Sequence, residues 1–264
     1  MRIVSHTCSN TEIVCALGLA HYLVGVDDHS DYPAEVVREL PRIGPDLDID
    51  IDKVRALQPD LVLTSLTVPG HERCVARLRE ADLPLLVAAP LSLSDVAADI
   101  ERIAAALGAR QRGQELAEHF RSAMSDAADQ QPPVPIAVEW WPKPVIVPAA
   151  ESWVTQMLPL AGAVNPWREH EGASVTVNDD AIQAMAPQAV VMSWCGVAVD
   201  KYRPHIVSRR PAWQSIPAVR NGHIYPISEA LLGRPGPRLI EGLQALRQIV
   251  ERVREAGPAI DHPV

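Results

Sequence analysis

One pattern recurs along this chain and constrains its fold more than any other: a helical segment, a turn that contains proline, and a short apolar run. It occurs at residues 50–65 (DIDKVRALQPDLVLTS), 72–90 (ERCVARLREADLPLLVAAP) and 179–194 (DDAIQAMAPQAVVMSW). Short apolar runs bounded by turn signals are typical of strands that are buried on both faces. Their alternation with helices predicts an α/β architecture with parallel sheets.

The pattern divides the chain into three parts. Residues 1–92 are expected to form an N-terminal α/β lobe. Residues 93–130, with Ser94 as the N-cap, have helical periodicity and predict one bridging helix, which Gly108 either leaves intact or breaks into two pieces. The segment QQPPVP interrupts this helix, and residues 131–264 repeat the α/β pattern as a C-terminal lobe. The predicted fold class is therefore α/β, with two parallel-sheet lobes bridged by a long backbone α-helix.

The opening MRIVSHTCSNTEIVCALGLA is interpreted as folded protein rather than as an export signal. Its apolar run ends after Val4, and Glu12 interrupts the apolar core that a signal peptide requires. A short strand, followed by a helix around residues 11–17 with Ser9 or Asn10 as its N-cap, accounts for the same sequence. We therefore expect a cytoplasmic protein, or a periplasmic or cell-surface protein if a leader precedes these residues.

Composition and motifs exclude several functional classes. The net charge is −9 and no basic stripe is present, so nucleic acid is not an expected partner. No apolar run approaches the roughly 18 residues of a membrane span. The sequence contains no phosphate-binding glycine loop, no nucleophile elbow and no HExxH motif, and its four cysteines form no zinc-ligand spacing. These absences favour a binding protein with no catalytic residues, no metal site and no cofactor of its own.

The positions that follow the strands are the candidate binding residues, because ligands of open α/β sheets lie beyond the carboxyl ends of the strands. The segments are 6–8, 28–32, 65–71, 140–143, 194–196 and 229–234. They contain three of the six tryptophans, in a chain with a single phenylalanine. Large rigid rings in such loops either face a ligand or seal a domain junction.

At these residues the chain resembles a known family. RIVSHTCSNTEIVCALGLAHYLVGVDDHSDYP is similar to the opening of class III substrate-binding proteins of ABC importers, in the cobalamin and ferric-siderophore branch of helical backbone metal receptors. The segments VEWWPKP, SWVTQMLPLAGAVNPW, PQAVVMSWCG, RPAWQSIPAVRNGHIYPI and RPGPRLIEGLQAL resemble the same family. The resemblance covers essentially the whole chain. It implies two lobes joined by a backbone helix and a ligand in the cleft between them, and it leaves corrinoids, haem and ferric siderophores as alternative ligands.

The resemblance also implies a set of cleft residues. They are Thr7, Cys8, Tyr32, Trp140, Trp141, Trp194, Cys195 and Arg234. Cys8 stands where the family usually has proline. The acidic residue expected near Arg234 is replaced by Ala230, and Glu229 is the candidate substitute. A guanidinium in a cleft pairs well with phosphate, carboxylate or amide groups of a polar ligand.

Two acidic residues match the positions that dock the transporter in this family. Glu72 is the match in the first lobe, and Asp180, one methylene shorter, is the match in the second. Glu72 also has a purely structural explanation, because a carboxylate in the first turn of a helix is favourable without any partner. Three histidines lie in or near the strand-end segments and are either solvated or metal ligands: His6, His29 and His71.

The rings and thiols have structural alternatives too. Trp140, Trp141 and Trp194 either stack on a flat ligand or seal the lobe interface. Cys8 and Cys195 are either small buried apolar side chains or reactive groups of an enzyme that acts on a metal chelate. The main prediction is non-catalytic binding of a corrinoid by a monomer, with an ABC importer permease as the implied partner. Ferric-siderophore or haem binding, the cysteine-centred enzyme and a purely structural interaction protein are the alternatives.

Overall fold

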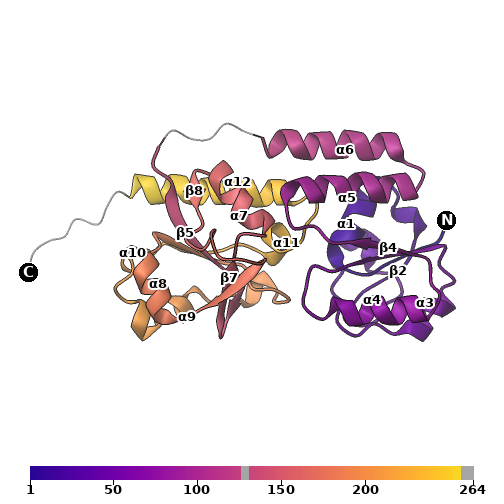
Figure 1. Ribbon diagram of the computed structural model, residues 1–264, viewed down its shortest axis with the longest axis horizontal. Coiled ribbons are helices and arrows are strands. Elements are labelled where there is room, and N and C mark those ends of the chain that lie inside the picture. Colours follow the sequence, from indigo (N-terminus) through magenta and orange to yellow (C-terminus); the bar gives the residue numbers. More distant parts are fainter. Residues whose placement is uncertain (126–130, 257–264) are drawn as a thin grey trace, which may run out of the picture. The chain divides into compact units, whose positions relative to one another are not determined.

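The computed structural model describes residues 1–125 and 131–256 of the 264-residue chain. The chain divides into two compact units (Figure 1). Unit 1 contains Met1–Ser122 and Pro235–Pro237, and unit 2 contains Ala123–Arg234 and Arg238–Val264. Each unit has its own parallel sheet, as the alternation in the sequence predicts.

The sheet of unit 1 has four parallel strands in the order β2-β1-β3-β4. The strands are β1 (Ile3–Ser5), β2 (Leu23–Val26), β3 (Leu61–Ser65) and β4 (Leu85–Ala88). The helices are α1 (Cys8–Ala16), α2 (Ala34–Val37), α3 (Ile51–Ala56), α4 (His71–Glu80), α5 (Leu93–Ala106) and α6 (Arg110–Ala123), with a 3-10 turn at Ala20–Tyr22. One core cluster joins Val4 and Val62 of adjacent strands to Cys74 and Leu78 of α4. The alternating pattern therefore reflects burial of both strand and helix residues.

The N-terminal ends of two helices differ from the sequence prediction. α1 begins at Cys8 with Thr7 at the N-cap, so the prediction that Ser9 or Asn10 caps this helix is wrong. α5 is capped by Ser92, whose hydroxyl accepts a hydrogen bond from the Asp95 amide, and not by Ser94. Neighbouring Ser, Thr and Asn residues are equivalent caps by residue type, so the tertiary position of the backbone decides which one is used.

Of the two alternatives at Gly108, the structure has the second, because residues 93–125 contain two helices, α5 and α6. Residues 126–130 of the predicted bridging segment lie outside the described residues. Gly108 has a φ of 72°, and the amides of Gly108 and Ala109 donate to the carbonyls of Ala105 and Ala104. This double hydrogen bond at a left-handed glycine is a Schellman stop. α6 then folds back beside α5 (Figure 1), and a Cβ atom on Gly113 would overlap the Ala104 side chain. The absence of that Cβ permits the close approach of the two helices.

Unit 2 contains two sheets. The larger, in the order β11-β10-β5-β8, is parallel and consists of β5 (Val134–Glu139), β8 (Ala163–Val164), β10 (Ala189–Met192) and β11 (Ile224–Pro226). The smaller is antiparallel and consists of β6 (Trp141–Pro142), β7 (Val145–Pro148) and β9 (Ser174–Val177). The sequence pattern does not predict this second sheet, because its strands are short and pair across a long separation.

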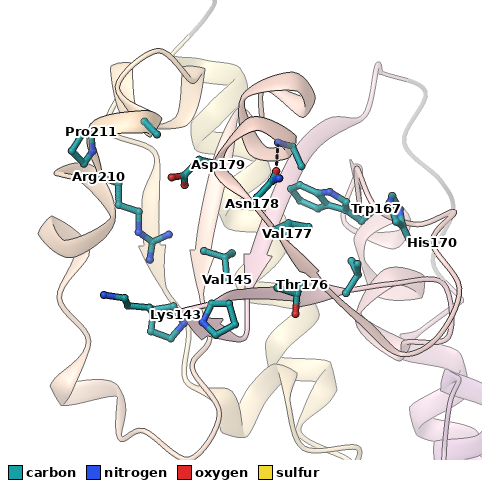
Figure 2. A pocket seen from close by; sticks show the side chains of 15 residues that line it. Lys143, Val145, Trp167, His170, Thr176, Val177, Asn178, Asp179, Arg210 and Pro211 are labelled. Carbon is teal, nitrogen blue, oxygen red and sulfur yellow. Dashed lines mark hydrogen bonds between the residues drawn. The ribbon is translucent and has the colours of Figure 1, made fainter.

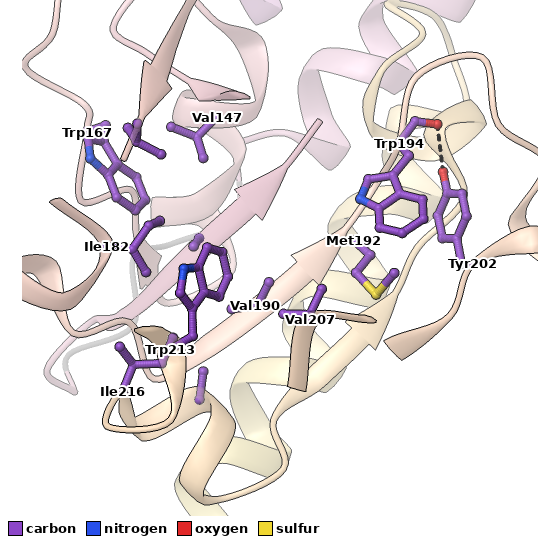
Figure 3. Close-up of a cluster of buried hydrophobic side chains, with 13 residues drawn as sticks. Val147, Trp167, Ile182, Val190, Met192, Trp194, Tyr202, Val207, Trp213 and Ile216 are labelled. Atoms are coloured by element: carbon purple, nitrogen blue, oxygen red, sulfur yellow. Dashed lines mark hydrogen bonds between the residues drawn. The ribbon is translucent and has the colours of Figure 1, made fainter. Parts of the chain in front are cut away.

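The helices of unit 2 are α7 (Trp153–Leu160), α8 (Asp179–Met185), α9 (Pro204–Ser208), α10 (Pro217–Arg220), α11 (Glu229–Leu232) and α12 (Leu239–Glu255), with 3-10 turns at Val199–Lys201 and Pro211–Trp213. The core of this unit is rich in large rings, among them Trp167, Trp194, Tyr202 and Trp213 (Figure 3). No helix within the described ranges is long and apolar enough to cross a membrane.

Candidate functional site

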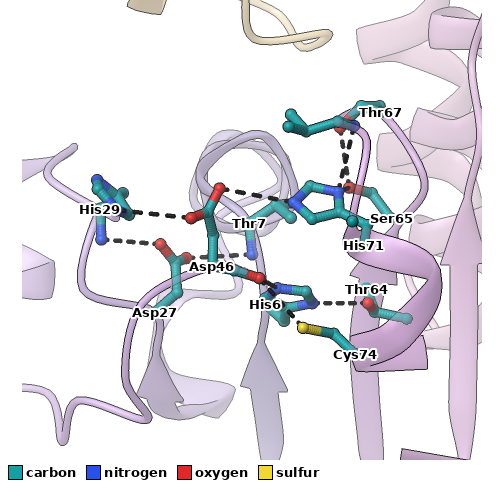
Figure 4. Close-up of polar contacts among 12 residues, drawn as sticks. His6, Thr7, Asp27, His29, Asp46, Thr64, Ser65, Thr67, His71 and Cys74 are labelled. Atoms are coloured by element: carbon teal, nitrogen blue, oxygen red, sulfur yellow. Dashed lines mark hydrogen bonds and ion pairs between the residues drawn. The ribbon is translucent and has the colours of Figure 1, made fainter. Parts of the chain in front are cut away.

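The carboxyl edge of the unit 1 sheet carries a cluster of buried polar side chains (Figure 4). His6 follows β1, Asp27 and His29 follow β2, and His71 begins the helix after β3. Asp46 joins them from the loop after Arg42, which forms a parallel bridge beside β2. Because parallel strands end at the same edge, residues far apart in the sequence meet there. We call His6, Asp27, His29, Asp46 and His71 the polar cluster of unit 1.

Hydrogen bonds define the protonation of His6. The side chain is fully buried, with Nδ1 2.7 Å from the Thr64 hydroxyl and Nε2 2.6 Å from the Asp46 carbonyl oxygen. A carbonyl only accepts, so Nε2 carries the proton, and Nδ1 accepts from Thr64. Burial lowers the pKa of His6 below its ordinary value, which keeps this imidazole neutral.

The Asp46 carboxylate lies between two other imidazoles. Its two oxygens are each 3.5 Å from a histidine Nε2, one belonging to the exposed His29 and the other to the buried His71. The contact with His71 lowers the pKa of Asp46, against the opposing effect of partial burial. Within the described ranges, no three His, Cys, Asp or Glu side chains are arranged to hold a metal ion. Metal ligation by these histidines is therefore not evident from the geometry.

Thr7 has an unusual backbone conformation, with a φ of 89° and a ψ of 137°. A positive φ is rare for a β-branched residue and costs conformational energy. Asp27 holds it in place, because its carboxylate accepts from the Thr7 amide at 3.1 Å and also from the His29 amide and the Ser30 hydroxyl. Strain of this kind is often found at binding sites. The structure thus distinguishes Thr7 among the predicted site residues.

Exposed apolar side chains occupy loops around the polar cluster of unit 1. They are Tyr32, Leu47, Leu66, Val68 and Leu91, each between 38% and 48% exposed. All follow strands of the parallel sheet or lie in the loop with Asp46. Of these five, the sequence analysis named Tyr32 and included Leu66 and Val68 in the segment 65–71, whereas Leu47 and Leu91 were not identified. Exposed apolar side chains that gather at one edge are typical of a binding surface.

In unit 2, Trp194 and Trp140 are less accessible than a stacking role requires. Trp194 is 6% exposed, its ring lies 5.2 Å from that of Tyr202, and its indole N–H donates to Glu139 at 2.8 Å. Trp140 is half-buried, 6.4 Å from the ring of Trp153, and its indole nitrogen has no hydrogen-bond partner within the described structure. Stacking on Trp194 stays a prediction that its burial disfavours.

Trp141 and Cys195 are both exposed at the same edge. The Trp141 indole N–H donates to the Lys143 carbonyl at 3.1 Å, which leaves the ring face accessible. The Cys195 amide donates to the Trp140 carbonyl. Although the residue reaches solvent, burial of its thiol and then the nearby Glu229 carboxylate raise the pKa of Cys195 to about 12. A thiol that stays protonated at neutral pH is a weak nucleophile. Cys8, the other predicted thiol, is partly exposed as the first residue of α1.

Arg234 has the acidic partner that the sequence left open. Its Nε and Nη2 atoms lie 3.0 and 2.8 Å from Oε1 of Glu229, and both side chains are mostly buried. Glu229 therefore pairs with Arg234 where Ala230 cannot, and a role of this pair in ligand binding stays a prediction. Glu229 begins α11, so the ion pair joins the start of this helix to Arg234, two residues beyond its end.

The two predicted docking acids are both exposed residues in first helical turns. The Glu72 carboxylate accepts from the Gly70 amide at 2.8 Å, and backbone N–H groups lower its pKa. Asp180 lies in the first turn of α8, which Asn178 caps. Both positions are accessible to a partner, and both have a structural explanation.

A separate hollow of about 650 Å³ lies on the antiparallel sheet of unit 2 (Figure 2). Its lining includes Lys143, Val145, Val177, Asp179 and Arg210. None of the predicted ligand residues lines this hollow. Pro142 and Lys143 of the strand-end segment 140–143 do line it, so the hollow adjoins that segment without including the predicted ligand residues.

Comparisons with known proteins identify the family. The family model described as periplasmic binding protein matches residues 3–231, so the chain belongs to this family. An uncharacterized ABC transporter substrate-binding lipoprotein of Bacillus subtilis is 30% identical, over 94% of this chain and 79% of its own.

Two solved structures extend the likeness to three dimensions. The crystal structure of the periplasmic vitamin B12 binding protein BtuF of Vibrio cholerae is 26% identical, with a TM-score of 0.78 over 96% of this chain and 98% of its own. The periplasmic heme-binding protein RhuT of Roseiflexus sp. RS-1, in its apo form, is 28% identical, with a TM-score of 0.78 over 97% and 98%. These findings confirm the predicted class III binding-protein fold and the resemblance to importer substrate-binding proteins.

The expectation of a cytoplasmic protein is wrong. One relative is described as a substrate-binding lipoprotein of an ABC transporter. The other two are described as periplasmic binding proteins, so the relatives do not support a cytoplasmic location. The error came from reading the folded first strand as evidence about the protein's location.

Proposed function

We propose that this protein is the substrate-binding component of an ABC importer and that it binds a large metal-containing small molecule, most simply a cobalamin-like corrinoid. The observation that carries this proposal is the similarity along the whole chain to proteins whose names state vitamin B12 and heme binding. Ferric siderophores and haem are the alternative ligands. Such a ligand would arrive with its own metal, so the proposal requires no metal site of the protein's own.

The proposed ligand contacts are strand-end residues, some of them exposed and others half-buried or buried. In unit 1 they are Thr7, Cys8 and Tyr32, together with the exposed apolar residues around the polar cluster. In unit 2 they are Trp140, Trp141, Cys195 and the Arg234–Glu229 pair. Aromatic and aliphatic side chains suit the faces of a macrocycle, and an arginine suits its polar substituents.

Binding without catalysis is part of the proposal. The raised pKa of Cys195 disfavours the cysteine-centred enzyme, since that thiol is a poor nucleophile at neutral pH. The expected partner is the importer permease, which Glu72 and Asp180 would meet by charge. We expect the protein to act as a monomer.

The test is a calorimetric titration with cyanocobalamin, hemin and ferric siderophores. Calorimetry is preferable to intrinsic fluorescence alone, because all six tryptophans belong to unit 2 and none reports directly on unit 1. One compound class that saturates at one equivalent supports the proposal and names the ligand. Conversion of a compound, with product release, would support the enzyme instead, and no binding by any compound would refute the proposal.

Matched variants assign the contacts. Tyr32→Ala and Trp141→Ala each remove an exposed ring from a strand-end loop, and both should weaken binding. Ile206→Ala removes a similarly exposed apolar side chain from α9, outside both strand-end edges, and should leave binding unchanged. Equal effects of all three variants would show that general loss of apolar surface, and not a defined site, is responsible.

A further inference from the structure

Glu139 is a buried carboxylate that the sequence analysis did not single out. It ends β5, is 1% exposed, and accepts hydrogen bonds from two side chains. The Trp194 indole N–H donates to Oε1 at 2.8 Å, and Arg210 donates to both oxygens, with Nη2 3.0 Å from Oε1. A buried ion pair is often replaceable by apolar residues without loss of stability. Its presence here therefore calls for a role other than stability.

On one side, Glu139 fixes the loop that follows β10. The Trp194 ring is held between Glu139 and Tyr202, and the Tyr202 hydroxyl donates to the Trp194 carbonyl at 2.9 Å (Figure 3). The Ser193 amide donates to the Glu139 carbonyl. This loop continues directly into Cys195, which lies at the strand-end edge of unit 2. The orientation of the edge thus depends on the buried carboxylate.

On the other side, Arg210 extends the network to α8. Its guanidinium carbon lies 4.2 Å from the ring centre of Trp213, and the Trp213 indole N–H donates to Oδ1 of Asp179 at 2.7 Å. Asp179 is the first residue of α8 and precedes the predicted docking residue Asp180. Arg210 and Asp179 also border the hollow of unit 2 (Figure 2). A continuous set of side-chain contacts therefore joins the β10 loop to the start of α8.

We propose that Glu139 and Arg210 are positioning residues, which orient the Trp194–Cys195 loop for ligand binding and hold the start of α8 in the same arrangement. Neither residue needs to contact the ligand. Glu139 acts through the Trp194 indole, and Arg210 acts through Glu139 and the Trp213 ring. The effect on ligand affinity rests on the proposed function, whereas the coupling between the loop and α8 does not.

The test uses the full chain labelled with ¹⁵N at its tryptophan indoles. Glu139→Gln removes the charge with little change in shape, and should shift the indole resonances of both Trp194 and Trp213 in the ligand-free protein. It should also weaken binding of cyanocobalamin or hemin, whichever the parent binds, by about tenfold, as expected when a hydrogen bond to a charged group is lost. Arg210→Lys keeps the charge and should restore most of the affinity that Arg210→Met loses.

The control is Asp99→Asn, which neutralises another buried carboxylate paired with an arginine, in unit 1. It should leave the tryptophan indole resonances and the affinity unchanged. The proposal is overturned if Glu139→Gln moves the Trp194 resonance alone, or lowers the melting temperature with affinity within about twofold of the parent. Should Glu139→Gln fail to fold, Arg210→Lys and Trp213→Phe test the same coupling. If the parent binds no chelate, the proposed function fails, and the indole resonances still decide the coupling.

Discussion

Asp99 offers a direct test of how burial affects a charge in this structure. It lies on α5, is 4% exposed, and its Oδ2 atom has no hydrogen-bond partner within the described structure. Its Oδ1 atom pairs with the half-exposed Arg102 at 2.6 Å. Burial outweighs this pairing and raises the pKa of Asp99 from 3.8 to about 6. Compared with the unfolded chain, the native state therefore holds the proton of Asp99 up to a higher pH.

The magnitude follows from linkage. The difference between a pKa of 3.8 and one of about 6 corresponds to about 3 kcal/mol of unfolding free energy, at about 1.4 kcal/mol for each pH unit. Below the unfolded pKa both states are protonated, and the free energy of unfolding carries no penalty. As the pH rises from about 4 to about 6 the unfolded state loses its proton first, so stability falls, and the full penalty remains above that range.

Asp99→Asn should remove this penalty. At pH 7.5 we expect the variant to be more stable by up to about 3 kcal/mol, because the raised pKa already includes the opposing attraction of Arg102. At pH 4 the two proteins should differ little. The measurement is urea unfolding at pH 4, 5, 6 and 7.5, followed by circular dichroism, since unit 1 contains no tryptophan. A difference in unfolding free energy that does not grow with pH, or a variant less stable at pH 7.5, would refute the reasoning.

Three further perturbations have defined outcomes. Glu229→Gln removes the negative charge that pairs with the buried Arg234 guanidinium and should cost about 3 kcal/mol in chemical unfolding. The same change removes a negative charge near Cys195, so the pKa of that thiol should fall and iodoacetamide should label it faster; an unchanged rate would contradict the assigned cause. Gly242→Ala would place a Cβ against the Leu231 carbonyl oxygen and should lower the melting temperature by at least 4 °C, although alanine favours a helix. Cys195→Ser keeps the size of a proposed ligand contact and should weaken the chelate titration only slightly, whereas loss of a product-forming activity would revive the enzyme hypothesis.

Much of the fold was predictable because it depends on local pattern. Buried strands such as Leu61–Ser65 and Ala189–Met192 begin with at least three consecutive apolar residues, and each follows a helix and a proline. Such a segment has few ways to bury its residues other than a parallel sheet between helices. The antiparallel sheet of β6, β7 and β9 was missed, since β9 pairs with β7 across more than 20 residues and neither strand alternates clearly.

The candidate site was predictable in part. The strand-end rule gave the segments that contain Tyr32, Trp141, Cys195 and Arg234, and the family resemblance selected these residues within them. The first three are exposed in the structure. Neither the strand-end rule nor the family resemblance identified Glu139. A charged residue that directly ends an apolar strand is nevertheless a signal by which the sequence could have indicated it.

Sequence by itself determined the class of fold and the family of this protein, because hydrophobic period, helix stops and turn residues act over a few neighbouring positions. Only the tertiary structure decided which polar side chains become partners. Asp46 meets His71, Glu139 meets Arg210, and Trp194 is buried, because parallel strands bring distant segments to one edge. The energy of a charge or a ring depends on what surrounds it, and those surroundings come from parts of the chain that no local pattern connects.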